Sequence, residues 1–222
     1  DQPRSRGLGD VYKRQPGRGA LTPGATPFGG LCPGSMSIVG EATGAFEWWE
    51  AEHPSAPADP DNAALIAQAL RVCERAESEF ETLADYVLAH GDACATNVVF
   101  DDADGQQPEA RFIDFEWAQA DDRARDLAII GGRVAAGPWY VPLDEAAHEE
   151  LLQQYVTAAN AYDPHAITNV DSLRIRRNAW TAYERTAMLL HVYRRAGEGN
   201  ALHREVLPLL RSRLAAWLDT QA

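Results

Sequence analysis

The chain has 222 residues, a hydrophobic content of 45% and a formal net charge of −13 at pH 7. This length and composition are sufficient for an ordinary buried core. The negative charge argues against a nucleic acid partner, because polyanion binding depends on Lys and Arg at the phosphates. No stretch reaches the roughly 18 apolar residues of a membrane span, and no signal peptide is apparent. The three cysteines lack the paired spacing of a zinc site. We therefore expect a soluble cytoplasmic protein with no membrane contact.

The first residues have an unusual composition. Residues 5–15 read SRGLGDVYKRQ, and DNA that encodes them resembles the adapter and transposase-end sequence used to build sequencing libraries. We therefore expect residues 1–15 to be a non-native, adapter-derived segment and exclude them from reasoning on the fold. They hold the only lysine of the chain, Lys13. Residues 16–60 are irregular and rich in Gly and Pro in their first half, and we expect disorder there or the remnant of a linker.

A regular pattern begins after residue 60. Asp61 can cap a helix whose apolar residues recur on one face. These residues are Leu65, Ala69, Val72, Cys73 and Ala76. Residues 86–88 then read as a short strand, and residues 97–100 and 111–114 read as the two strands of a hairpin joined by a turn-rich segment.

The rest of the chain favours helices. Their expected ranges are residues 121–135, 145–161, 172–196 and 201–218. The sequence thus predicts an α+β fold over residues 61–219, mainly helical, with a short β-hairpin.

Two motifs lie at the ends of predicted strands. Residues 90–97 read HGDACATN, and residues 112–117 read FIDFEW. The hairpin would bring Asp114 beside Asp92 and Asn97. Carboxylate and amide oxygens are ligands that Mg²⁺ prefers, and phosphoryl transfer also needs an anionic acceptor beside the substrate hydroxyl. The set therefore indicates phosphoryl-transfer chemistry.

The two motifs resemble those of the aminoglycoside phosphotransferase and choline kinase superfamily, whose loops run H-G-D-x-x-x-x-N and I-D-F/W-E/G. Residues 121–128 (DDRARDLA) are similar to the family's G-D-P-x-x-D-L-A segment. The resemblance covers residues 61 to about 218. It implies the mainly helical C-terminal lobe of a protein-kinase-like fold, in which the hairpin carries the catalytic and metal loops.

The resemblance also implies roles for single residues. Asp92 would be the catalytic base, and Asn97 and Asp114 would be the magnesium ligands. His90 would brace the catalytic loop, and Asp126 would anchor the following helix to it. Glu116 would lie close to the metal and act on it through the metal's ligands, or it would be a surface carboxylate.

The implied function is that of a small-molecule kinase, a phosphotransferase with an alcohol group as acceptor. It would use Mg²⁺ and move the γ-phosphate of ATP or GTP to the hydroxyl of a small metabolite or antibiotic, with cationic acceptors among the candidates. The superfamily's N-terminal lobe supplies a nucleotide-clamping lysine, and nothing between residue 16 and the first motif provides one. We therefore expect a fragment with little or no activity on its own and with its nucleotide-binding residues unknown.

Departures from the family pattern leave the acceptor open. The family's usual Leu-His after the catalytic Asp is Ala93-Cys94 here, and the family's Gly and Pro before Asp126 are absent from the segment Asp121, Asp122 and Arg123. These changes leave the chemical residues intact.

Other interpretations of the sequence remain. A pseudokinase-like binding module could keep the metal loop without catalysis, and a metal-dependent hydrolase could use His90, Asp92 and Asp114. Aromatic residues on one predicted helix could form a cage for a quaternary ammonium, although ordinary packing is favoured. They are Trp180, Tyr183 and Tyr193. Four acidic residues could contribute to an anionic pocket: Asp144, Glu145, Asp171 and Glu184.

Overall fold

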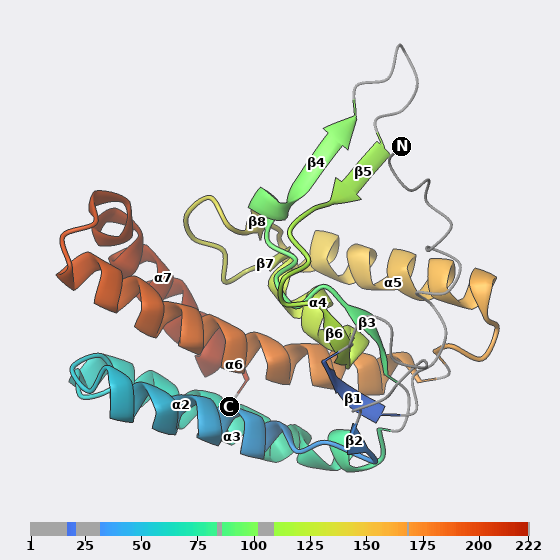
Figure 1. The fold of residues 1–222 in the computed structure, drawn as a ribbon, viewed down its shortest axis with the longest axis horizontal. Coiled ribbons are helices and arrows are strands. Elements are labelled where there is room, and N and C mark those ends of the chain that lie inside the picture. Colours follow the sequence, from blue (N-terminus) through green and yellow to red (C-terminus); the bar gives the residue numbers. More distant parts are fainter. Residues whose placement is uncertain (1–16, 21–31, 84–85, 102–108, 168, 222) are drawn as a thin grey trace.

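The computed structural model describes residues 17–20, 32–83, 86–101, 109–167 and 169–221. These residues are mostly helical, with few and short strands (Figure 1). The α-helices are α2 (Ile38–Glu52), α3 (Pro60–Glu81), α4 (Arg123–Ile129), α5 (Glu145–Tyr162), α6 (Val170–Gly197) and α7 (Ala201–Asp219), and a 3₁₀ turn, η1, spans Ala95–Asn97. The strands are β1 (Gly17–Ala20), β2 (Cys32–Pro33), β3 (Val87–Ala89), β4 (Val98–Asp101), β5 (Glu109–Phe112), β6 (Gln119–Asp121), β7 (Gly131–Gly132) and β8 (Val141–Pro142).

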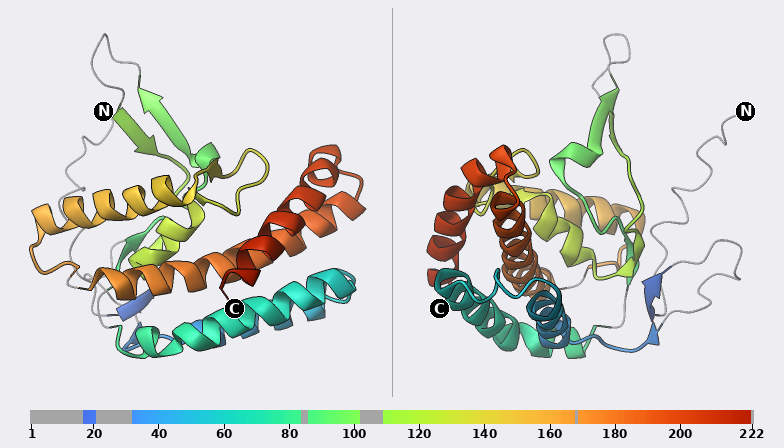
Figure 2. Two further views of the ribbon diagram at one scale, coloured as in Figure 1. Left: turned by 180° about the vertical axis from the view of Figure 1, so that it is seen from behind. Right: turned by 60° about the vertical axis from the view of Figure 1, so that its left-hand side comes forward.

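The long helix α6 is the centre of the helical part. Helices α2, α3, α4 and α7 all contact it, and α2 lies along α3 (Figures 1 and 2). Its side chains Trp180, Leu189 and Leu190 are fully buried. The apolar face of α3 predicted from the sequence is buried in this core, which confirms the helical period of that segment.

Each of the helices α2 to α7 begins at a residue whose side-chain oxygen accepts a backbone N–H of the first turn. These N-caps are Ser37, Asp59, Asp122, Asp144, Asn169 and Asn200. Such caps satisfy N–H groups that have no partner within the helix and fix where each helix starts. For α3 the cap is Asp59 and not Asp61 as expected, because Pro60 occupies the first helical position, where proline is tolerated.

A buried ionic network joins α4 to α6. The Asp122 carboxylate is fully buried, and its Oδ2 accepts hydrogen bonds from Arg176 Nε and Trp180 Nε1, each at 3.1 Å. Next to it, Asp121 accepts from Arg18 Nε at 2.6 Å and from Arg125 Nη1 at 3.0 Å. These two arginines hold the pKa of Asp121 below its usual value although burial opposes this.

Short strands place the two sequence motifs. Strand β6 pairs antiparallel with both β3 and β1, in a sheet of order β2-β1-β6-β3. Strands β4 and β5 pair antiparallel, as the hairpin prediction requires, and extend away from the helices (Figures 1 and 2). The segment before the first motif therefore lies beside the segment that follows the second.

Several sequence expectations need correction. Residues 16–60 are not irregular throughout: α2 spans Ile38–Glu52 and buries Phe46 and Trp49 against the core. The helix expected over residues 121–135 ends at Ile129, because the chain then pairs as β7 with β8. The adapter-like segment 1–15 lies outside the described residues.

A search of the described residues for membrane-spanning segments found no helix with the length and apolar character that crossing a bilayer requires.

We expect Asp122→Ala to lower the free energy of unfolding by about 3–5 kcal/mol, because it leaves the buried Arg176 guanidinium without its carboxylate. Asp144→Ala is the matched control, since Asp144 is also an N-cap but is exposed. It should cost only about 1 kcal/mol. Urea unfolding of both variants at pH 7 measures the difference, and equal losses would show that the network adds nothing beyond capping.

Candidate active site

The first motif forms a tight turn directly after β3. Gly91 has φ +78, and a Cβ at this position would lie 2.3 Å from the carbonyl oxygen of Trp117. Only glycine adopts this conformation without strain and leaves room for the backbone of the second motif. The glycine of the HGD sequence is therefore needed for the close approach of the two loops.

The Asp126 carboxylate fixes this turn to helix α4. Its Oδ2 accepts the N–H of His90 at 2.7 Å, and its Oδ1 accepts the N–H of Gly91 at 3.0 Å. Burial raises the pKa of Asp126, although both backbone hydrogen bonds favour the ionised form. This contact matches the anchoring role that the resemblance implies for Asp126.

His90 links the two motifs. Its buried ring lies against Phe112 and Phe115, with centroid distances of 5.6 and 4.6 Å. Nε2 lies 2.8 Å from the carbonyl oxygen of Ile113, and Nδ1 lies 3.3 Å from the backbone N of Asp92. A neutral imidazole that donates from Nε2 and accepts at Nδ1 satisfies both contacts. Both ring nitrogens are thus used in holding the loops.

The Asp92 carboxylate is held by two donors. Asn97 Nδ2 donates to Asp92 Oδ2 at 2.9 Å and to the Asp92 carbonyl oxygen at 2.9 Å. Cys94 Sγ donates to Asp92 Oδ1 at 2.9 Å. Burial and the Asp92 carboxylate raise the pKa of the Cys94 thiol, so the thiol is protonated and able to donate at neutral pH. Asp92 is partly exposed and is held in one orientation as an acceptor.

Asn97 and Asp114 supply oxygens that suit a magnesium ion. Asn97 uses its amide nitrogen on Asp92, which leaves its Oδ1 without a partner among the described residues. Asp114 is exposed, makes no hydrogen bond or ion pair within the same residues, and has φ +62. A non-glycine residue in this region is strained, and such strain is often found at functional sites. The donor set therefore fits Mg²⁺.

The six site residues predicted from the sequence differ in whether hydrogen bonds join them to one another. Hydrogen bonds join His90, Asp92, Asn97 and Asp126. Asp114 connects to them only through its neighbour Ile113, whose N–H donates to the Asn97 carbonyl oxygen at 2.9 Å. Glu116 is exposed, and the structure gives it no contact with the others. Across the described residues no three His, Cys, Asp or Glu side chains form a metal-binding group.

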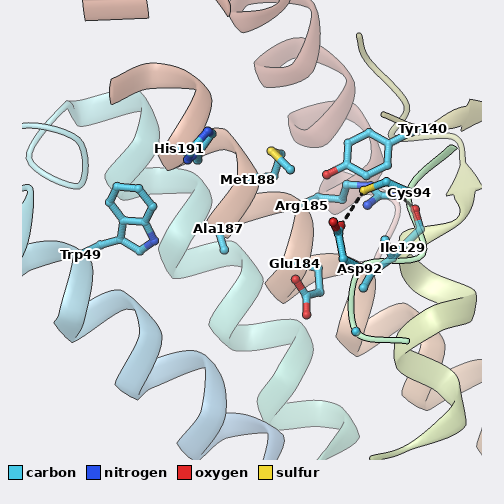
Figure 3. Close-up of a pocket in the computed structure, with 11 residues that line it drawn as sticks. Trp49, Asp92, Cys94, Ile129, Tyr140, Glu184, Arg185, Ala187, Met188 and His191 are labelled. Atoms are coloured by element: carbon cyan, nitrogen blue, oxygen red, sulfur yellow. Dashed lines mark hydrogen bonds between the residues drawn. The ribbon is translucent and has the colours of Figure 1, made fainter. Parts of the chain in front are cut away.

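A cavity of about 240 Å³ opens beside Asp92 (Figure 3). Its walls come from the catalytic loop, from α2 and from the C-terminal half of α6 (Figure 3). The lining side chains include Asp92, Cys94, Trp49, Tyr140, Glu184 and His191. Of the four acidic residues considered from the sequence, only Glu184 lines it, and of the three aromatic candidates none does. Trp180 is instead fully buried and bonded to Asp122, so it packs in the core.

The sequence analysis missed Trp49, Tyr140 and His191, which come from segments far apart in the chain. Helix α2 was not predicted, the facing of α6 could not be fixed from the sequence, and the segment around Tyr140 has no periodic pattern. Only the aromatic character of Trp49 and Tyr140 could have drawn attention to them.

Glu184 and Arg185, two charged residues of the cavity wall, both have contacts inside the protein, although Arg185 Nη1 has no hydrogen-bond partner among the described residues. Glu184 accepts from Arg125 Nε at 2.8 Å. Arg185 stacks on the ring of Tyr140 at 3.5 Å and donates to the carbonyl oxygens of Ala128, Ile129 and Val134 at 2.9–3.1 Å. Burial lowers the pKa of His191, so its ring is neutral at pH 7. The cavity thus combines apolar and aromatic walls with few polar groups near Asp92.

We expect Gly91→Ala to destabilise the protein by at least about 2 kcal/mol, since positive φ costs an alanine about 1–2 kcal/mol and the new Cβ meets a backbone oxygen. Gly44→Ala on α2 is the control, because nothing lies within 4 Å of its Cβ position. It should stabilise by about 0.5–1 kcal/mol. Urea unfolding separates the two, and a neutral Gly91→Ala would mean that the loops do not approach as described.

Residues 36–168 match the model of the phosphotransferase enzyme family (APH). The match covers more than half of the chain, contains both motifs and Asp126, and begins just before α2. Searches of curated proteins and of solved structures gave no significant match. The chain belongs to the APH phosphotransferase enzyme family.

Proposed function

We propose that this chain is the helical, catalytic lobe of a kinase-like small-molecule kinase. It would transfer the γ-phosphate of ATP or GTP to the hydroxyl of a small metabolite or antibiotic. One observation carries the proposal: the Asp92 carboxylate is held by Asn97 and Cys94 at the wall of a cavity large enough for a small acceptor. Family membership alone supports phosphotransferase activity more generally.

Asp92 is suited to accept the proton of the acceptor hydroxyl. The two donors hold the carboxylate in one orientation, which lowers the entropic cost of aligning it with the hydroxyl. As the oxygen attacks the γ-phosphorus, the proton passes to Asp92 and the nucleoside diphosphate leaves. Asn97 Oδ1 and Asp114 would hold Mg²⁺, which neutralises charge on the transferring phosphate. His90 and Asp126 act by holding the loop and not by touching the substrate.

The size and walls of the cavity favour a small acceptor. Its volume of about 240 Å³ is below the roughly 300–1,000 Å³ of sites for drug-sized ligands. Glu184 and the Trp49 ring could attract a cationic group, but Arg125 offsets the charge of Glu184. A small metabolite therefore fits better than a large antibiotic, and the cationic acceptor remains one candidate among small alcohols.

The exposed apolar side chains of the hairpin and second motif could contact the nucleotide base. They are Val99, Phe100, Phe112, Ile113, Phe115 and Trp117. Exposed apolar groups at this density are typical of binding surfaces. No lysine follows Lys13, so the chain lacks the clamping lysine that the family resemblance leads us to expect. We propose that the chain alone has little or no activity and that the surface is used in a longer protein.

The alternatives are less well supported. A binding module without catalysis would also lack the lysine, but it would not need a carboxylate held as Asp92 is. A metal-dependent hydrolase that uses His90 as ligand is disfavoured, because both ring nitrogens already contact the protein. The free, buried thiols of Cys73 and Cys94 fit a cytoplasmic location, where thiols stay reduced.

The test is turnover by the full-length protein, with any coding sequence upstream of residue 16 restored. We expect Asp92→Asn to lower kcat at least about 100-fold, because general-base catalysis contributes about 10²–10⁴-fold. Asp114→Ala should also abolish turnover, since it removes a phosphate-neutralising metal ligand. Both variants should keep the melting temperature of the parent.

Glu150→Gln, at an exposed position on α5, is the control and should keep full activity. Near-full activity of Asp92→Asn would overturn the assignment of the base. Nucleotide binding without turnover by the parent protein would support the binding module, and turnover by residues 16–222 alone would contradict the need for further residues.

A further inference from the structure

Arg123 is buried without a partner. It is the first residue of α4, and its side chain is only 7% exposed. Among the described residues it makes no hydrogen bond, ion pair or ring contact. The other buried arginines of this region, Arg176, Arg177 and Arg185, each donate two or more hydrogen bonds. An arginine side chain this little exposed normally has an acceptor for its guanidinium, because partial desolvation of the charge is costly.

Arg123 lines a second cavity, of about 300 Å³. This cavity is lined by residues of the C-terminal end of α3, of the start of α4 and of the start of α6. The cavity beside Asp92 is lined by residues of the other half of α6, from Glu184 to His191. On α6 the nearest lining residues of the two cavities are Arg176 and Glu184, about 12 Å apart along the helix axis at 1.5 Å per residue, and the cavities share no lining residue. The second cavity is therefore a separate site.

Several groups around Arg123 favour a negatively charged ligand. Arg176 also lines the cavity, and its guanidinium is only partly used by Asp122 and by Ser172 Oγ, at 3.1 and 2.7 Å. The cavity includes the capped N-terminus of α6, the longest helix described, where the backbone dipoles favour an anion. Thr82 adds a hydroxyl donor.

One acidic side chain opposes these groups. Glu79 lies in the wall, on the last turns of α3. It would repel a bare anion at its own end of the cavity and would accept a hydrogen bond from a hydroxyl. The site thus suits a ligand with an oxyanion at Arg123 and a hydroxyl toward Glu79.

We propose that this cavity binds a small metabolite through an oxyanion, a phosphate or carboxylate group, with the Arg123 guanidinium as its main contact. Planar guanidinium groups bind both oxyanions through paired, charge-assisted hydrogen bonds. The family pattern G-D-P-x-x-D-L-A has proline where this chain has Arg123, so the pattern itself supplies no guanidinium at this position. The proposal does not depend on the proposed kinase activity.

The test is isothermal titration calorimetry of the purified chain with two probes, inorganic phosphate and malonate, at constant ionic strength. The ionic strength is kept constant because the net charge of −13 repels anions from the whole protein, and this repulsion depends on the salt concentration. We expect at least one probe to bind with a dissociation constant on the order of 1 mM, and Arg123→Gln to weaken it at least about 10-fold. The stronger probe identifies the kind of oxyanion.

Two further variants keep the result interpretable. Arg123→Pro also removes the guanidinium, and proline is accepted at the first position of a helix, so this variant should fold and lose binding equally. Arg133→Gln removes the same charge from an arginine whose side chain is 50% exposed, and it should bind as the parent does. Far-UV circular dichroism and thermal unfolding verify that each variant is folded.

Binding of neither probe to the parent up to about 50 mM would overturn the proposal. So would equal binding by the parent and a folded Arg123→Gln, which would place the anion elsewhere, for example at the catalytic loop. A matching loss in Arg133→Gln would show a general charge effect and would also overturn it.

Discussion

The buried contact between Asp122 and Arg176 fixes the short helix α4 against the long helix α6, and the rest of the candidate site depends on it. Both side chains are withdrawn from solvent and joined at 3.1 Å, with Trp180 as a second donor to the same oxygen. An ion pair in such surroundings is costly to break, because each partner alone would be an uncompensated buried charge. One helical turn after Asp122, Asp126 holds the catalytic loop. The position of Asp92 is thus set by a core contact on α6.

The distribution of arginines explains how an acidic chain builds this core. Arg185 donates to the carbonyl oxygens of Ala128 and Ile129 at the end of α4 and to that of Val134 just after it. These carbonyls have no partner within the helix, so a cation at this end both satisfies them and interacts favourably with the helix dipole. At the start of α4, Arg176 donates a hydrogen bond to Asp122, the N-cap residue of the helix. The short helix is therefore held at both ends by α6.

Much of the site was predictable from the sequence because it is local. The spacing within HGDACATN places Asp92 and Asn97 on one turn, and the strand pattern brings the second motif back beside it. Helices α3, α5, α6 and α7 were predicted within a few residues, since caps and apolar period mark them. Helix α2 was missed because Gly40, Gly44 and the preceding Gly- and Pro-rich stretch weaken its helical signal, while burial of Phe46 and Trp49 stabilises it. Tertiary packing outweighs local propensity there.

The cavity walls were not predictable, because they depend on which face of α6 meets α4. Rotation of a helix by one residue turns its face by about 100° and would replace Glu184 and Met188 in the wall by their neighbours. That rotation is set by Arg176, Trp180 and Arg185, each of which bonds to a residue more than 50 positions away in the chain. The apolar periodicity within α6 therefore does not predict which distant residues its side chains bind.

Two of the positions where the chain departs from the family motif lie at cavity walls. Cys94 stands where the family has histidine, and its thiol lines the cavity beside Asp92 and donates to that carboxylate. Arg123 stands where the family has proline, and it lines the second cavity. The residues that hold the backbone of the catalytic loop, Asp126 and Gly91, keep the family identity. Neither Cys94 nor Arg123 uses its side chain to hold the backbone of this loop, whereas a change at Asp126 would leave the partly buried N–H groups of His90 and Gly91 without an acceptor.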